Sequence, residues 1–436
     1  MADEALTEDT QEKISQIQLD ALVKLHKRFL DGRIGGRRAI LKSIDMSGLS
    51  LVGEDLRQSD FTGCNMTNMN LSNVNLQEAC LYAVDLSKSN LNDAIFIRAD
   101  LRGAKIESAD LQGADLEKAD LRMGGLSNYG DYTPPSSVNF RGADLSGAKL
   151  SGSMASKADF GDAKMNNVNL ANADLRGAEL SGADLSGSDM KNVQMHGASL
   201  SDTILIGVNV DDLAVSGADV SEAVTDNNIG QSIGSLETPL PKQVELHQKW
   251  ISSGGAEGTR LDLSGFDLRE LKSLKQMKLT ALKAENAKFI DMNLYKIELQ
   301  SSVLNKSDFR NCDMEGADIR GASMVGANLC HVNLKTADCS SLMFGVSGGN
   351  KRFAPCVFDE ATMRYADLRN ANLKNASFKN ADLSYADVQG ADLSGADLSG
   401  AIIKNLNIEE AITEGAILPE TSNKKAFSLD AIKNED

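Results

Sequence analysis

Residue types that build catalytic and metal sites are scarce in this 436-residue chain. It contains 6 prolines, 4 histidines, 6 cysteines and 1 tryptophan, and 5% of its residues are aromatic. The histidines lie in unrelated places, and no two cysteines have the CxxC spacing typical of a metal site. No nucleophile elbow, zinc-protease helix or dinucleotide fingerprint occurs. We therefore expect no enzyme, no cofactor and no metal, and cysteines that serve packing.

Long apolar runs and net positive charge are also missing. No run approaches the ~20 residues of a membrane helix, and no signal-peptide pattern precedes the first predicted helix. These absences favour a cytoplasmic protein without membrane contact. Asp and Glu number 62 against 45 Lys and Arg, a net charge of −17. Direct nucleic-acid binding is disfavoured because it needs basic side chains on the phosphates. The acidity still permits mimicry of a nucleic acid.

What the chain does have is a large apolar residue at every fifth position. We call this position i; Leu101, Ile106, Leu111 and Leu116 show the period, and alanine often stands at i−2. In an extended segment i−2 and i point to one side, while i−1 points away. Residues i+1 and i+2 are rich in Ser, Arg, Lys, Asn and Gly, and Gly and Asn tolerate the positive φ of tight turns. Each repeat is thus predicted to be a three-residue strand followed by a corner.

Four such corners of about 90° would close a square coil of about 20 residues, stacked on the next coil at a β-ladder spacing of about 4.8 Å. The phenylalanines support this length, because three pairs lie twenty residues apart. The pattern predicts that each pair stacks in adjacent coils: Phe140 with Phe160, Phe289 with Phe309, and Phe358 with Phe378.

The units Ala381-Asp382-Leu383-Ser384-Tyr385 through Ala396-Asp397-Leu398-Ser399-Gly400 resemble the pentapeptide repeat family, A(D/N)LxX. The resemblance covers about 300 residues. It implies an all-β solenoid, the right-handed quadrilateral β-helix; the handedness comes from the family alone. Some members of this family mimic duplex DNA and inhibit DNA gyrase. Those are usually single rods, whereas this sequence predicts two capped lobes.

Breaks in the period divide the chain into two lobes that look like tandem copies. A helix over 11–31, with Ile14, Ile17, Ala21, Leu25 and Phe29 on its apolar face, is predicted to cap the first lobe, and a helix over about 241–252 the second. The histidines of these helices, His26 and His247, recur in the two copies, so packing explains them better than catalysis. The predicted segments are a disordered terminus 1–10, a helical cap and turn 11–38, a first β-helix lobe 39–225 interrupted at 122–139, a linker with the second cap helix 226–260, a second lobe 261–418 interrupted at 345–357, and a tail 419–436.

The two interruptions are candidate contact sites, since loops on rigid scaffolds often carry function and aromatic and Arg side chains favour interfaces. The first carries Tyr129 and Tyr132, and the second carries Arg352 and Phe353. Two interpretations stay open: the loops contact a partner, or each bridges a register change and folds against its own lobe.

Two charged features are weaker candidates. Aspartates twenty residues apart at i−1, such as Asp100 and Asp120, either hold Ca²⁺ or are hydrated carboxylates that turn apart; the other pairs are Asp318 with Asp338 and Asp367 with Asp387. The first cap is basic. Its side chains bind an acidic partner, contact the other lobe, or form a solvated surface, and these three interpretations stay open. This basic cap patch consists of Lys24, Arg28, Arg33, Arg37 and Arg38.

The sequence therefore favours a non-enzymatic protein–protein interaction scaffold built from two rigid solenoids, with contact through projecting loops or flat faces. The alternative is a DNA-mimicking modulator of a DNA-binding enzyme such as DNA gyrase. The protein partner's identity and self-association are left open.

Overall fold

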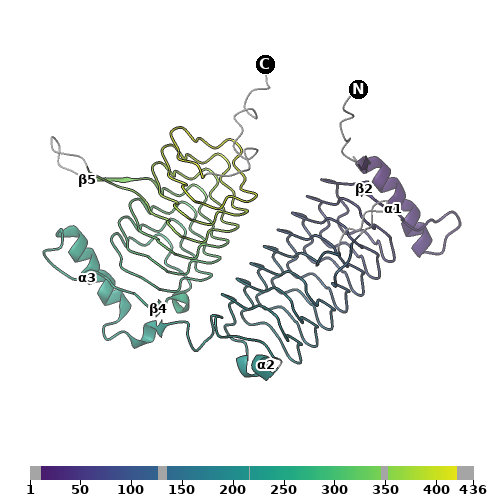
Figure 1. Cartoon of the computed structure of the whole chain (residues 1–436), viewed down its shortest axis with the longest axis horizontal. Coiled ribbons are helices and arrows are strands. Elements are labelled where there is room, and N and C mark those ends of the chain that lie inside the picture. The colour runs from purple at the N-terminus through teal and green to yellow at the C-terminus, as the bar shows by residue number, and fades with distance from the viewer. Residues whose placement is uncertain (1–10, 126–134, 216, 345–351, 420–436) are drawn as a thin grey trace, which may run out of the picture. The chain divides into compact units, whose positions relative to one another are not determined.

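The computed structural model describes residues 11–125, 135–215, 217–344 and 352–419. The chain splits into two compact units, Met1–Asn228 and Ile229–Asp436, each a stack of coils (Figure 1). Parallel β-bridges join the i−1 residues of successive coils, as in Asp60↔Cys80 and Asp308↔Asn328. Most bridged residues are twenty apart and four such ladders run along each unit, so four repeats form one square coil.

The core of each coil is made by the i and i−2 side chains. Leu101, Ile106 and Leu111 are at most 1% exposed, and Ala99 and Ala104 fill the corners between them. The three predicted phenylalanine stacks are confirmed, with ring centroids 4.9 Å apart for Phe140–Phe160, 4.3 Å for Phe289–Phe309 and 5.0 Å for Phe358–Phe378. Each unit has its own buried apolar cluster.

The corners place residue i+2 in the left-handed region. Gly103 (φ +67°) and Asn167 (φ +57°) follow the predicted preference, but Lys88 (φ +60°) and Arg98 (φ +55°) adopt the same conformation. A left-handed residue with a side chain costs roughly 1–2 kcal/mol. Hydrogen bonds between coils offset part of this cost: the Lys88 N–H donates to the Glu107 carbonyl at 2.9 Å. Glycine therefore helps the corner without being required.

The first cap differs from the prediction in its start and in its buried face. Residues Glu12–Lys13 form β1, which pairs in parallel with β2 (Ile44–Asp45), and α1 spans Gln16–Leu30. Ser15 and Gln18 form a capping box that starts the helix there. The buried face consists of Leu19, Val23 and His26. The predicted face was largely wrong, since Ile17 is 81% exposed, Phe29 37% exposed and Ala21 exposed. Of its other members, Ile14 is buried but precedes the helix, and Leu25 is half-buried.

The second unit begins with an equivalent arrangement. β3 (Gln231–Ser232) pairs in parallel with β4 (Phe266–Asp267), and the 3-10 turn η1 (Ile233–Ser235) leads to α3 (Leu240–Ser252). The repeat period slips by one residue at a 3-10 turn, η2 (Arg269–Leu271), which leaves Lys272 at φ +57°. Ladder partners in this first coil are accordingly 21 apart, as in Asp262↔Lys283.

A buried histidine fastens each cap helix to its first coil. The Nδ1 atom of His26 accepts from the Ala39 N–H at 3.0 Å, so its Nε2 carries the proton and donates to the Arg57 carbonyl at 3.0 Å. His247 Nδ1 accepts from the Leu261 N–H at 3.1 Å. Both side chains are fully buried. The packing role predicted for these two histidines is confirmed.

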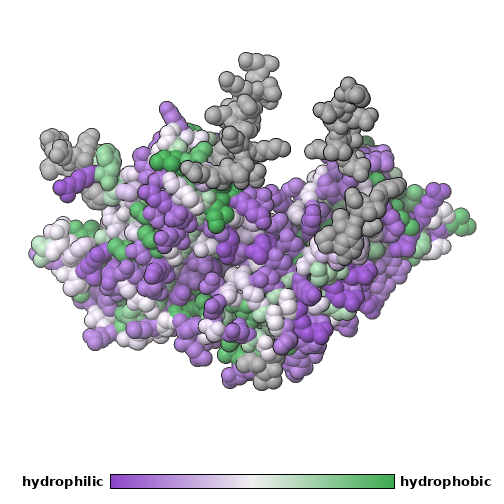
Figure 2. Space-filling model, in the orientation of Figure 1, coloured by the Kyte–Doolittle hydropathy of each residue, from purple (hydrophilic) through white to green (hydrophobic). Residues whose placement is uncertain are grey.

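Three further elements complete the described fold. α2 (Val210–Val215) places Leu213, which is fully buried, in the core cluster of the first unit. β5 (Leu342–Phe344) and β6 (Arg352–Ala354) form an antiparallel hairpin in the second unit. Within the described ranges, no helix has the length and apolar character needed to span a bilayer. Hydrophilic side chains cover most of the face seen in Figure 2.

Candidate interaction surface

The Asp or Asn at i−1 closes the corner that follows it. Its side-chain oxygen accepts a hydrogen bond from the backbone N–H two residues later, as Asp45 does from Ser47 at 2.9 Å and Asn65 from Thr67 at 3.1 Å. This is an Asx turn, which a short side chain with a terminal oxygen can make. The outward position i−1 is therefore structural in many repeats, and the D/N preference of the repeat follows from it.

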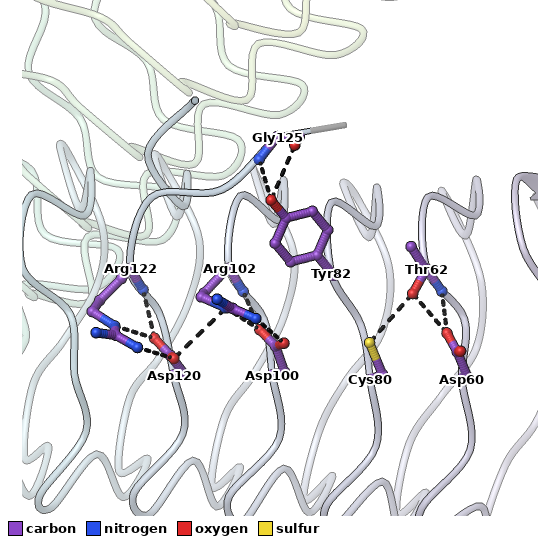
Figure 3. Close-up of polar contacts among 9 residues, drawn as sticks. All are labelled: Asp60, Thr62, Cys80, Tyr82, Asp100, Arg102, Asp120, Arg122 and Gly125. Carbon is purple, nitrogen blue, oxygen red and sulfur yellow. Dashed lines mark hydrogen bonds and ion pairs between the residues drawn. The ribbon is translucent and has the colours of Figure 1, made fainter. Parts of the chain in front are cut away.

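Where arginine stands at i+1, it adds a second bond to the same carboxylate. Arg102 donates from Nε and Nη2 to the two Asp100 oxygens at 2.8 and 2.7 Å, and Arg122 does the same to Asp120 (Figure 3). Two parallel bonds make this a geometrically specific, charge-assisted pair. The same fork recurs at Asp55–Arg57, Asp174–Arg176, Asp267–Arg269, Asp308–Arg310, Asp318–Arg320 and Asp367–Arg369.

These forks change the interpretation of the aspartate pairs. Arg102 also lies 3.7 Å from Asp120 in the next coil, so one guanidinium serves both carboxylates. Arg320 bridges Asp318 to Asp338 and Arg369 bridges Asp367 to Asp387 in the same way, both at 3.6 Å. The interpretation that the two carboxylates of each pair turn apart was therefore wrong. An arginine guanidinium lies between them, in the position considered for Ca²⁺. In the part of the chain that the structure describes, no group of three or more metal-ligating side chains occurs.

The forks keep the carboxylates ionised. Partial burial raises the pKa of Asp120, Asp318 and Asp367, but hydrogen bonds from Arg122, Arg320 and Arg369 outweigh it, and the pKa of each carboxyl lies below its ordinary value.

The two interruptions are insertions at matching corners. Ladder partners that cross them are 34 apart in both units, as in Lys105↔Asn139 and Ser323↔Val357, against 20 in most of the ladders. Each insertion therefore adds 14 residues, and the coil continues on the far side. The repeat was expected to run to Phe344, but Leu342–Phe344 form β5 and already belong to the second insertion.

The base of the first insertion lies against the coil beside the Arg102 fork. Gly124 and Ser136 exchange backbone hydrogen bonds at 3.0 and 2.8 Å. A Cβ on Gly103 would lie 2.5 Å from the Gly124 carbonyl oxygen, so the two backbones touch. The Tyr82 hydroxyl holds the next residue, Gly125, by donating to its carbonyl and accepting from its N–H (Figure 3).

The second insertion forms a longer, more apolar base. Met343 of β5 lies directly opposite Phe353 of β6. The neighbouring residues Leu342 and Ala354 face the coil, since a Cβ on Gly321 would lie 2.9 and 3.5 Å from their Cβ atoms. Strand alternation then directs Met343 and Phe353 away from the coil. They are 55% and 64% exposed, and the hairpin projects from the stack of coils (Figure 1).

The predicted contact residues are thus only partly located. Tyr129 and Tyr132 lie outside the described residues. Arg352 and Phe353 are exposed on β6. Sequence reasoning missed Met343, because Leu342 and Phe344 were assigned to the repeat. It also missed Tyr82, which occupies an ordinary i+1 position; no sequence signal distinguishes it.

The basic cap patch is spread over the end of α1 and the turn after it. Lys24, Arg28, Arg33, Arg37 and Arg38 are all exposed. Two of them bind within the cap and turn, since Arg28 donates to the Ile34 carbonyl and Arg33 pairs with Asp31. Arg38 donates to the Gln58 carbonyl of the first coils. A role for the patch in partner contact stays a prediction.

The chain is similar to solved structures of pentapeptide repeat proteins. No curated protein matches the sequence. Solved structures that match include a trypsin-treated variant of QnrB1, a plasmid-mediated fluoroquinolone resistance protein, at 21% identity over 43% of this chain and 92% of that chain, with a TM-score of 0.23. Another is HetL, a pentapeptide repeat protein involved in heterocyst differentiation regulation in the cyanobacterium Nostoc sp. strain PCC 7120. The match has 18% identity over 91% of this chain and 96% of that chain, with a TM-score of 0.15.

A family profile carries the assignment. The profile described as Pentapeptide repeats (8 copies) matches residues 39–122, 136–207, 297–335 and 361–412 in overlapping segments. These segments contain the Asx corners, the alanines at i−2 and the buried residues at i described above. With the profile matched over more than half of its residues, the chain belongs to the pentapeptide repeat family.

Proposed function

We propose that this protein is a non-enzymatic interaction scaffold and that the β5–β6 hairpin is its main contact element. The observation that carries this proposal is the outward-facing pair Met343 and Phe353. Exposed apolar residues that adjoin one another on a projecting element are typical of protein interaction sites. Phenylalanine and methionine are both enriched at interfaces.

The base of the hairpin is held in place before any partner arrives. Leu342 and Ala354 pack on Gly321, and the coil beneath is fastened by the Arg320 fork. A contact element that is already ordered loses less conformational entropy on binding. At the base of the first insertion Tyr82 holds Gly125, which has no side chain, whereas the base of the second insertion displays Met343 and Phe353. The second insertion is therefore the better docking element.

The test is affinity capture from the native host's lysate, read by mass spectrometry. The double variant Met343→Ser with Phe353→Ser removes the apolar pair without touching the residues that face the coil. Ile402→Ser is the matched control, because Ile402 is 54% exposed on the same unit. We expect one partner to be captured by the intact protein and by the control, and to be lost with the double variant. Equal capture by all three would overturn the assignment to this hairpin.

A second candidate, mimicry of DNA toward an enzyme such as DNA gyrase, is favoured by the uneven charge. Residues 1–228 hold 34 acidic and 21 basic side chains, a net charge of −13, whereas residues 229–436 hold 28 and 24, a net charge of −4. Within 179–228 there are nine acidic residues and one basic residue, Lys191. The arginine forks oppose mimicry, since they neutralise carboxylates along the coils. A supercoiling assay with gyrase at micromolar protein tests this candidate, and the absence of both inhibition and protection would remove it.

A further inference from the structure

An apolar groove lies between the second cap helix and the first coils of its own unit. Its volume is about 400 Å³, within the range of small-molecule sites. α3 contributes Leu240 and Val244, and the coils contribute Leu263, Leu274, Met277 and Leu279. α3 lies along the β4 end of this unit in Figure 1.

The first unit shows the same helix face packed more closely. Leu19 and Val23 precede His26 by seven and three residues, as Leu240 and Val244 precede His247. Leu19 is 1% exposed and Val23 5%, while Leu240 and Val244 are only half-buried. The duplicated cap is therefore closed in one copy and open in the other.

The open copy has a local cause. The extra residue of the first coil is taken up by η2, Arg269–Leu271, and Leu271, the last residue of this turn, lines the groove. The coil that packs against α3 therefore differs in backbone conformation from the coil that packs against α1 in the first unit.

Two lysines flank groove residues along the coil that packs against α3. Lys272 and Lys275 are exposed and flank Ser273 and Leu274, which line the groove. Lys275 also lies 5.2 Å from the centre of the Tyr295 ring. The nearest acid in sequence, Glu270, accepts a hydrogen bond from Ser232 at 2.9 Å. The largely apolar groove thus has two exposed lysines directly beside its lining residues in the sequence.

We propose that this groove binds a single linear alkyl chain that ends in an anionic group, a free long-chain fatty acid. The apolar walls on α3 and the coils take the chain, and Lys272 and Lys275 meet the carboxylate. This site is independent of the β5–β6 hairpin, so its failure would leave the proposed function untouched.

The experiment is calorimetric titration of the full chain with octanoate, decanoate and dodecanoate below their micelle concentrations. Burial of each further methylene contributes about 0.8 kcal/mol, which predicts a roughly fourfold gain in affinity per methylene. Trp250, the only tryptophan in the chain, lies on α3 and gives a second readout by fluorescence. We expect 1:1 saturable binding that strengthens along the series. Absence of saturable binding, or affinity independent of chain length, would overturn the proposal.

Three variants test the position of the ligand. Val244→Phe fills the groove and should weaken dodecanoate binding at least tenfold. Lys272→Glu with Lys275→Glu should weaken dodecanoate but not dodecyltrimethylammonium. Lys306→Glu is the matched control, since Lys306 is exposed and has nearly the same backbone conformation, φ +58° against +57° for Lys272; it should change neither.

Circular dichroism and the urea midpoint check that each variant folds. Dodecanoate binding that survives Val244→Phe would place the ligand elsewhere and overturn the assignment. A change of sedimentation with Val244→Phe, together with no dodecanoate binding in the parent protein, would also overturn it and would indicate that the groove holds a second copy of the chain.

Discussion

The Tyr82 hydroxyl and the Gly125 backbone make a reciprocal pair: the hydroxyl donates to the Gly125 carbonyl at 3.0 Å and accepts from the Gly125 N–H at 2.9 Å. One side chain on a regular coil thus satisfies both polar groups of a residue 43 positions later. It fastens the first insertion at the place where the chain leaves the coil.

Replacing Tyr82 should loosen that insertion. Tyr82→Phe removes both hydrogen bonds, each with a net value of about 1 kcal/mol, and keeps the ring. We expect hydrogen exchange at Gly124 and Ser136 to accelerate about tenfold or more, with the global urea midpoint nearly unchanged. Tyr295→Phe, which alters a tyrosine of the second unit, serves as the control. Unchanged exchange at Gly124 would show that backbone pairing alone holds the base.

Removing a shared arginine should expose the repulsion between stacked carboxylates. Arg102→Ala leaves Asp100 and Asp120 adjacent in the ladder, and we expect a loss of about 0.5–1 kcal/mol, discounted for the exposure of the pair. The loss should be larger at low salt than at high salt. Arg57→Ala is the control, because its partner Asp55 stacks on Asn75 and not on a second aspartate. Urea unfolding at two salt concentrations makes the comparison; an equal salt dependence for both variants would contradict it.

The same arginine should prevent calcium binding. Its guanidinium lies between the carboxylates that a Ca²⁺ ion would need, so we expect no heat when Ca²⁺ is titrated into the parent protein by calorimetry. Saturable heat from the parent protein would mean that a different set of oxygens binds the ion.

Loss of a stacked phenylalanine should destabilise one unit at a time. Phe160→Ala and Phe309→Ala each empty a fully buried site, and truncations of this kind cost about 3–5 kcal/mol. The two residues lie in separate core clusters. We therefore expect each variant to lower one of two calorimetric transitions, with the altered unit identified by limited proteolysis. Equal shifts of both transitions would show that the units unfold together.

The cap histidine should make stability depend on pH. Burial lowers the pKa of His26 below its ordinary 6.5, despite hydrogen bonding at Arg57 and the nearby Asp55. Below pH 6.5 the unfolded chain then binds more protons than the folded one. The stabilisation of the folded chain that depends on neutral His26 is therefore fully present above pH 6.5 and is lost as the pH falls from there. Urea midpoints from pH 7.5 to 5 should fall for the parent protein and less for His26→Gln. The exposed His196→Gln is the control, and an identical slope for His26→Gln would refute the assignment.

Much of the coil could be predicted from sequence because its determinants are local. The five-residue spacing of Leu101 and Ile106 sets which side chains enter the core, and Phe140 and Phe160 report the coil length by their separation. The caps were harder, because helical periodicity alone does not fix where a helix starts. Ser15 and Gln18 set that start through their side chains. The buried face depends on contacts with the coils, which the helical period alone does not give.

The candidate site was harder still, since its geometry depends on contacts between distant residues. Nothing around Tyr82 distinguishes it from other i+1 residues until Gly125 is placed beside it. Likewise, Leu342 and Phe344 resemble repeat residues, and only their pairing with β6 shows that they belong to a hairpin that displays Met343. The aspartate pairs were located correctly, but the arginine two residues after each first aspartate decides their chemistry.

The two insertions have a consequence for how such rods change. In both units the coil resumes its ladder after 14 added residues, so the neighbouring coils, and not the residue count, determine where each strand lies. That corner is consequently a position that can accept inserted segments of other lengths or sequences while the stack of coils stays intact. The inserted segments and the supporting coils can then diverge separately: the base of the first insertion contains Gly124 and Gly125, whereas that of the second displays Met343 and Phe353.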